Sequence, residues 1–442
     1  MSDNLSTISK SEAAEEHKRA AHGSDSDSEP EFAEIVDFPE GGTKAWLVVF
    51  GAWCGLFSCF GIWNSVGVFQ AWLIEHQLKN YDQGTISWIF SVFSFLFFFC
   101  GVQIGPVFDK YGARMLVLAG SVLFIIALVL FSISKEYYQF MLTFGVLGGV
   151  SCSLIFTPSV TTVGHWFFKK RAFATGLAAT SGGIGGIIFP IFFQQTSKTI
   201  GFGWSVRAMA LMCAFMSVLA KVGLKGKKSK NSALIDLSGF KDIRFTFTAI
   251  AFFMIEWGLQ TPISYLTTYG LSKASNASDE AFAYYLVAIL NAGSVIGRWI
   301  PGWFADRFGR YNLMIINIAL CTIFTFAIWL STAAPSNTSR APMTAYAVLF
   351  GLASGSGISL AAVCVSQICK TKDYGKRYGT IYSFGAIGTL TGQPIAGAIL
   401  ARTNGKDFTG LVAFCGACYV VCLVAFILVR GIGTNWKLRA VY

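Results

Sequence analysis

One short sequence occurs twice in this chain, and each copy closes a long apolar run. The first copy spans Gly105–Arg114 and reads GPVFDKYGAR, and the second spans Gly302–Arg310 and reads GWFADRFGR. The acidic positions Asp109 and Asp306 are 306 − 109 = 197 residues apart, which is close to half of the hydrophobic part of the chain. A turn repeated at this offset predicts two similar halves. In a membrane protein, two such halves can rock around a site held between them.

The composition places the chain in the membrane. Hydrophobic residues make up 54% and charged residues only 13%, which is too apolar for a soluble fold of this length. A membrane-spanning helix takes roughly 20 apolar residues. The runs without a charged side chain are 45–74, 83–108, 115–134, 137–164, 172–197, 311–339, 341–369, 378–401 and 408–429. Three more spans, around 204–223, 245–269 and 281–304, give about twelve. We expect an all-α membrane protein with twelve transmembrane helices in two six-helix pseudo-symmetric bundles.

This pattern divides the chain into five parts. We expect a disordered acidic cytosolic tail, an N-terminal six-helix bundle, a basic cytosolic linker, a C-terminal six-helix bundle and a short cytosolic tail. Their bounds are 1–44, 45–223, 224–244, 245–430 and 431–442. Residues 1–44 hold 11 acidic and 4 basic side chains. Low hydrophobicity and high charge are typical of disorder.

Charge also predicts the orientation. With the N-terminus in the cytosol, the inner loops and the C-terminal tail hold 21 of the 30 basic residues that follow residue 44. The positive-inside bias then places both termini in the cytosol. We expect the protein to lie in the plasma membrane or in a vacuolar or other internal membrane. Basic charge therefore reflects topology, and we expect no nucleic acid partner. Two glycosylation acceptors, Asn276 and Asn337, lie in predicted outer loops.

No pattern indicates an enzyme or a metal protein. The four histidines are scattered, and neither a metal-ligand cluster nor a phosphate-binding loop is present in the sequence. We therefore expect no catalytic residues, no metal site and no cofactor.

The repeated Gly-x-x-x-Asp-(Lys/Arg)-x-Gly turn resembles the loop motif of the major facilitator superfamily, between helices two and three and again between eight and nine. The resemblance covers about residues 45–430 and implies transport by alternating access. It implies a gating role for the repeated loops, whose acids would contact helix N-termini or arginines that separate when the halves tilt. The residues assigned to gating are Gly105, Asp109, Lys110, Gly112, Arg114, Gly302, Asp306, Arg307, Gly309 and Arg310.

Two further segments narrow the resemblance. Residues 39–46 (PEGGTKAW) resemble the entry to helix one of the monocarboxylate porter family, and residues 165–178 (HWFFKKRAFATGLA) resemble that family's entry to helix five. Fungal members of the family are the nearest likeness. The family implies a small organic anion as substrate.

Two lone charges inside predicted helices are the sharpest site candidates, because charges in a bilayer are costly and usually face a cavity. Arg298 lies where the porter family has an arginine that pairs with the substrate carboxylate, and its forked guanidinium suits such an anion. The chain departs from the family at Ser294, where an aspartate is usual, and at Asn64, where a lysine is usual. Glu256 is then the candidate for proton coupling. The alternative for these charges is a structural ion pair or hydrogen bond that holds the predicted helices seven and eight together.

Polar residues without charge complete the candidate site. We expect Asn64, Asn291 and Gln260 to line the substrate cavity with Arg298, although each of them could instead join helices by hydrogen bonds. The expected function is secondary active transport of a small organic anion or related metabolite, coupled to protons. Export of a secondary metabolite is one alternative, and a non-transporting nutrient sensor on the same fold is another. The expected partners are the small-molecule solute, protons and the lipid bilayer, and an accessory protein is left open.

Overall fold

The apolar runs of the sequence form helices joined by short connections. The computed structural model describes residues 41–164, 166–167, 171–224, 237–333, 339–369, 374–403, 405–437 and 440. These residues contain no β-strand. Most of the predicted acidic tail and basic linker, Asn337 and part of the C-terminal tail lie outside the described residues, as do the side chains of Asp109, Asp306 and Arg307.

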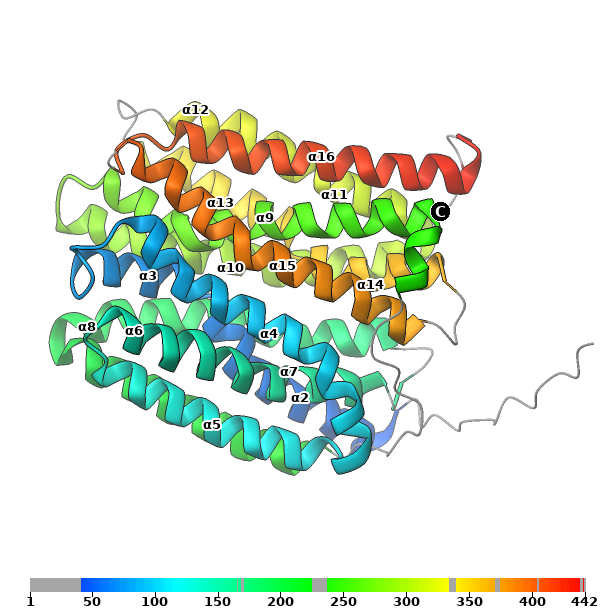
Figure 1. Ribbon diagram of the computed structural model, residues 1–442, viewed down its shortest axis with the longest axis horizontal. Helices are drawn as coiled ribbons and strands as arrows, with labels where there is room; N and C mark the ends of the chain where they lie inside the picture. Colours follow the sequence, from blue (N-terminus) through cyan, green and yellow to red (C-terminus); the bar gives the residue numbers. More distant parts are fainter. Residues whose placement is uncertain are drawn as a thin grey trace, which may run out of the picture. The chain divides into compact units, whose positions relative to one another are not determined.

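The first group of helices corresponds to the first half of the chain (Figure 1). Its elements are α2 (Gly42–Trp63), α3 (Val66–Glu75), α4 (Gln83–Tyr111), α5 (Ala113–Ile133), α6 (Tyr137–Phe140), η1 (Met141–Gly148), α7 (Gly149–Gly164) and α8 (Arg171–Gly223). The long helix α8 contains two crossings, because Gly201 interrupts it with a φ of 77°. The predicted first span is not one continuous helix, since α2 ends before Asn64 and α3 begins after Ser65.

The second group corresponds to the second half of the chain and is coloured from green to red in Figure 1. Its elements are η2 (Leu237–Lys241), α9 (Ile243–Ser272), α10 (Ala277–Phe308), α11 (Arg310–Phe324), η3 (Thr325–Trp329), α12 (Leu330–Ala333), α13 (Arg340–Ser354), α14 (Gly357–Gln367), α15 (Tyr374–Ala401) and α16 (Thr409–Thr434). A short break at Gly355 and Ser356 separates α13 from α14, much as Asn64 and Ser65 separate α2 from α3.

The predicted number of crossings is confirmed over the described residues. Nine helical stretches are long and apolar enough to span a bilayer, and one of them, Phe173–Gly223, contains the two crossings of α8. The 30-residue helix α9 and the pair α13 and α14 supply two more crossings. The count is therefore twelve. The exact bundle boundaries given above stay a prediction.

Packing within and between the groups defines where a site can lie. In the first group α2 packs on α8, and in the second group α10 packs on α13 while α9 packs on α15 and α16. The groups meet where α8 contacts α10, where α4 contacts α15 and where α3 contacts α9. Polar residues that reach these contacts lie between the two halves.

The repeated turn has the same backbone conformation in both halves. Gly112, between α4 and α5, has φ 79° and ψ 163°, and Gly309, before α11, has φ 90° and ψ 143°. Residues with a side chain rarely adopt a positive φ of this size. Glycine does so readily, and it therefore permits the tight reversal at both places. The internal repeat read from the sequence is therefore also a repeat of the chain's conformation.

Candidate functional site

One face of α10 carries two of the predicted substrate residues, Asn291 and Arg298, together with Ser294. Asn291, Ser294 and Arg298 are three and four residues apart, so they lie along one side of the helix. That side packs on α8, where a Cβ added at Gly183 would lie 3.4 Å from Ser294 Oγ. Gly293 and Gly297 lie on another side, against the backbone of α13. The glycines thus fix how α10 is rotated, and the rotation aims Arg298 at the first half.

The side chain of Arg298 crosses between the two groups of helices. Its Nη1 donates a hydrogen bond of 2.7 Å to the carbonyl of Ala179 in α8. Its guanidinium carbon lies 5.0 Å from the ring centroid of Phe60 in α2, within the range of a cation–π contact. The residue is only 8% exposed. A guanidinium has five N–H donors, and the described contacts use one of them.

Asn64 and Asn291 lie beside the arginine and bind backbone carbonyls. Asn64, at the break after α2, donates from Nδ2 to the carbonyl of Gly182 at 3.1 Å. Asn291 donates from Nδ2 to the carbonyl of Gly186 at 3.1 Å and lies 3.4 Å from that of Asn64. Its Oδ1 is buried with no hydrogen-bond partner. We call Asn64, Asn291, Ser294 and Arg298 the arginine cluster.

Glycines of α8 make this close approach possible. A Cβ at Gly182 would meet the ring of Phe60, and a Cβ at Gly186 would lie 2.5 Å from Asn291 Cγ. These close approaches show that the glycines serve the packing of the helices. The arginine cluster therefore sits where α2, α8 and α10 approach one another.

The fourth predicted substrate residue, Gln260, lies in a separate set of polar residues. Its Oε1 accepts a hydrogen bond of 3.1 Å from Gln393 Nε2, and Gln393 Oε1 lies 3.4 Å from Ser91 Oγ, which donates to it. Tyr265 donates to the carbonyl of Gln393 at 3.0 Å and also bonds Ser87. We call Gln70, Ser87, Ser91, Gln260, Tyr265 and Gln393 the glutamine cluster. It joins α3 and α4 to α9 and α15 and contains no charged side chain.

Glu256 faces α15 and not Arg298. It is 5% exposed and lies one turn before Gln260 on α9. A Cβ at Gly388 would lie 3.3 Å from its Cβ, and one at Gly385 would lie 3.6 Å from its Cγ. Its Oε2 is buried without a hydrogen-bond partner. Within the described ranges the ion pairs are Arg244 with Asp242 and Arg340 with Asp279, so the alternative of an ion pair between Glu256 and Arg298 is not seen there.

Aromatic side chains beside the arginine cluster were not singled out from the sequence. Phe60 and Trp63 stack with centroids 5.0 Å apart and planes at 5°, and Trp63 contacts Phe98 edge to face at 5.6 Å. Phe98 of α4 contacts Tyr382 of α15, with ring centroids 6.2 Å apart, so the ring contacts extend into the second half. We call Phe60, Trp63, Phe98 and Tyr382 the aromatic wall. In the sequence, the signal that could have indicated these rings was the three-residue spacing of Phe60 and Trp63, just before Asn64.

The predicted gating residues are described only in part. Arg114 donates from Nε to the carbonyl of Leu224 at 2.8 Å, which ties the start of α5 to the end of α8. Lys110 is exposed near the end of α4, and Arg310 begins α11. Gly105 and Gly302 lie within α4 and α10. The gating role of all ten residues, including Asp109, Asp306 and Arg307, stays a prediction.

One predicted glycosylation acceptor is described. Asn276 is exposed before α10, and its Oδ1 accepts hydrogen bonds of 3.0 Å from the backbone N–H groups of Ser278 and Asp279. The amide thus caps the helix. Its modification stays a prediction.

Comparisons with known proteins agree with this architecture. A sequence model described as Major Facilitator Superfamily matches residues 52–340 and 300–439. The MFS transporter asaE of Aspergillus flavus is 37% identical over 409 residues, covering 91% of this chain and 90% of that protein. The riboflavin transporter MCH5 of Saccharomyces cerevisiae is 33% identical, covering 95% and 85%. The fujikurins efflux protein of Gibberella fujikuroi is 34% identical, covering 89% and 83%.

A solved structure has a similar fold. The crystal structure of the nucleoside transporter NupG superposes with a TM-score of 0.68 at 15% identity, covering 88% of this chain and all of that chain. At this identity the likeness concerns the fold alone. It confirms the predicted arrangement of two helical bundles.

Proposed function

Because the chain belongs to the major facilitator superfamily and is a transporter of that type, we propose that it moves an organic anion by alternating access, with Arg298 as the main substrate contact. The single observation that carries the proposal is the environment of this arginine. It is a buried cation between the two halves, whose described partners are a backbone carbonyl and an aromatic ring. A carboxylate or similar anion would fill the unused donors of the guanidinium.

The location of the contacts supports a link between binding and movement. Arg298 belongs to the second half, whereas Ala179 and Phe60 belong to the first. Tilting the halves apart at this interface would break both contacts and expose the guanidinium. An anion bound to Arg298 would have different affinities for the two arrangements of the halves, and it would therefore favour the arrangement that it binds more tightly.

The aromatic wall supports a substrate with a large apolar or planar body. Phe60 contacts the guanidinium of Arg298, and from it a chain of ring contacts runs through Trp63 and Phe98 to Tyr382 in the second half. Such rings bind flat or apolar groups well. This favours an organic acid larger than a simple monocarboxylate. The narrower assignment to the monocarboxylate porter family stays part of the proposal.

Export of a secondary metabolite is the second candidate function. It is favoured by the aromatic wall and by the name of a relative that is an efflux protein for fujikurins. The departures at Asn64 and Ser294 also suit a substrate other than the porter family's small anions. In both candidates the termini face the cytosol, and the plasma membrane or an internal membrane holds the protein.

Proton coupling is proposed at Glu256. The Oε2 atom of its buried carboxyl has no described hydrogen-bond partner. When a carboxyl takes up a proton, it loses its negative charge and gains an O–H group that can donate a hydrogen bond. Glu256 packs against Gly385 and Gly388 of α15, whereas the arginine contacts α8 and α2. Coupling would therefore act through movement of the helices rather than through a direct Glu256–Arg298 pair.

Transport by the purified full chain in proteoliposomes tests the proposal. The solutes are a panel of small monocarboxylates, aromatic acids and the neutral amides of those acids, with an imposed proton gradient. We expect aromatic acids to be moved and their amides to be excluded. Arg298→Ala should abolish transport, whereas Arg402→Ala, which removes an exposed arginine after α15, should not.

Two results would contradict the proposal. Equal transport of acids and their amides would show that no anion is recognised, and unchanged kinetics in Arg298→Ala would remove the arginine from the site. If no solute moves in either direction, a sensor on the same fold becomes the better account.

A further inference from the structure

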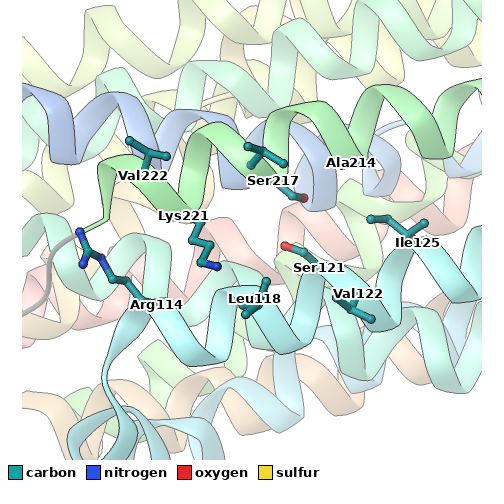
Figure 2. A pocket seen from close by; sticks show the side chains of 10 residues that line it. Arg114, Leu118, Ser121, Val122, Ile125, Ala214, Ser217, Lys221 and Val222 are labelled. Atoms are coloured by element: carbon teal, nitrogen blue, oxygen red, sulfur yellow. The ribbon is translucent and has the colours of Figure 1, made fainter.

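A groove runs along the outer side of the first group of helices, between α5 and the second crossing of α8. It encloses about 730 Å³, and none of the residues that line it belongs to the arginine or glutamine cluster (Figure 2). Arg114 and Lys221 lie at one end, and Ser121 and Ser217 face each other further along it. The groove therefore has a basic end and a longer part with little charge.

The basic end is built by two helix termini. Arg114 lies at the start of α5, and its Nε is held by the carbonyl of Leu224, which fixes the guanidinium there. Lys221 lies in the last turn of α8, one turn before Leu224. The described residues that line the groove include these two cations and no acid. The end is therefore suited to an anion at the surface of the membrane.

The rest of the groove is apolar and open to the bilayer. Leu118, Val122, Val218 and Val222 line it and are between 36 and 71% exposed. Leu118 and Val122 follow Arg114 at steps of four residues, and Val218 and Val222 are also four residues apart, so apolar side chains line the groove on both helices. Large apolar side chains at this depth are covered by hydrocarbon.

A polar atom without a partner lies within the apolar part, between Leu118 and Val122 on α5. Ser121 is 5% exposed, and its buried Oγ has no hydrogen-bond partner. It points into the groove towards Ser217 (Figure 2). A buried hydroxyl left unpaired costs free energy, so an acceptor in the groove would stabilise it.

We propose that this groove binds one anionic glycerophospholipid. Arg114 and Lys221 hold the phosphate, the hydroxyl of Ser121 donates to an ester carbonyl, and an acyl chain continues beyond it along Val122 and Ile125. Along α5, Arg114, Ser121 and Ile125 follow one another in the order of phosphate, ester and acyl chain in such a lipid. The basic end is on the predicted cytosolic face, where anionic lipids are concentrated.

Lipid retention by the purified full chain tests this inference. The detergent-solubilised protein is incubated with equal amounts of phosphatidylserine and phosphatidylcholine, and the retained lipids are quantified by mass spectrometry. We expect the wild type to prefer phosphatidylserine. Lys221→Gln should lower this preference about fivefold, as expected for the loss of one basic contact with a headgroup.

Two further variants make the result specific. Ser217→Phe should displace the lipid by filling the groove without changing charge, and gel filtration checks that it folds. Lys241→Gln removes an exposed lysine on the same membrane face but outside the groove, and should leave the preference unchanged.

The inference is overturned if the wild type retains both lipids equally, if Lys241→Gln lowers retention as much as Lys221→Gln, or if both groove variants retain phosphatidylserine as the wild type does. Displacement of phosphatidylserine by the transported solute would also overturn it, since the groove would then belong to the solute's path.

Discussion

The two interfaces between the helical halves differ in charge, although both are polar and buried. The arginine cluster, where α8 meets α10, contains a cation with no acid among its described partners. The glutamine cluster, where α4 and α3 meet α15 and α9, consists of neutral groups that bond mainly to one another. A neutral network can hold two halves together by itself, whereas an uncompensated cation in a membrane calls for an anionic partner. We therefore propose that the solute binds at the arginine cluster and that the glutamine cluster holds the two halves together.

The largest effect is expected from crowding the arginine interface. Gly182→Val would drive a side chain into the ring of Phe60 beside Arg298, so we expect transport to be lost and the protein to lose about 1–3 kcal/mol of stability. Gly176→Val is the matched control, because a Cβ at Gly176 has nothing within 4 Å. Thermal unfolding and transport in proteoliposomes measure both. Equal effects of the two substitutions would show that helix propensity, and not this contact, is responsible.

A smaller effect is expected at Glu256, which lies near the neutral interface. Glu256→Gln keeps the size of the side chain but removes its ability to exchange a proton. Wild-type transport should change between mildly acidic and neutral medium, and the variant should lose this dependence while still binding solute. Glu136→Gln, at an exposed carboxyl, should behave as the wild type does. An intact pH profile in Glu256→Gln would rule out the proposed relay.

The smallest effect is expected within the glutamine cluster. Tyr265→Phe removes the hydrogen bonds to Gln393 and Ser87 but keeps the ring, so we expect a loss of about 1 kcal/mol of stability with solute affinity unchanged. Tyr138→Phe, at an exposed tyrosine, should change neither quantity. Thermal unfolding and solute binding provide the measurements. If Tyr265→Phe abolished binding, the roles of the two interfaces would have to be exchanged.

The sequence was sufficient for the features that depend on local chemistry. Nine apolar runs without charge and three further spans predicted twelve crossings, and the repeated turn predicted the two halves, with Gly112 and Gly309 in matching conformations. Such features follow from bilayer thickness and from the backbone freedom of glycine. The break in the first span at Asn64 was not predicted, because it lies within an uncharged run of ordinary apolar character.

The composition of the site could be predicted only in part. Spacing along α10 places Asn291 and Arg298 on one face, but it does not say which neighbour that face meets. The rotation of α10 depends on Gly293 and Gly297 against α13 and on Gly183 and Gly186 of α8. The same holds for the rotation of α9, whose Glu256 packs against Gly385 and Gly388 of α15. Two charges on consecutive helices therefore face different neighbours, and Gln260 lies in the other cluster.

Binding measurements on a matched pair of solutes test the central claim most directly. The affinity of the transported acid and of its neutral amide is measured by calorimetry for the wild type and for Arg298→Ala. If the anion binds Arg298, removing either the charge of the solute or the arginine should weaken binding about tenfold or more, and removing both should weaken it little further. Independent, additive losses, or full affinity for the acid in Arg298→Ala, would contradict the account.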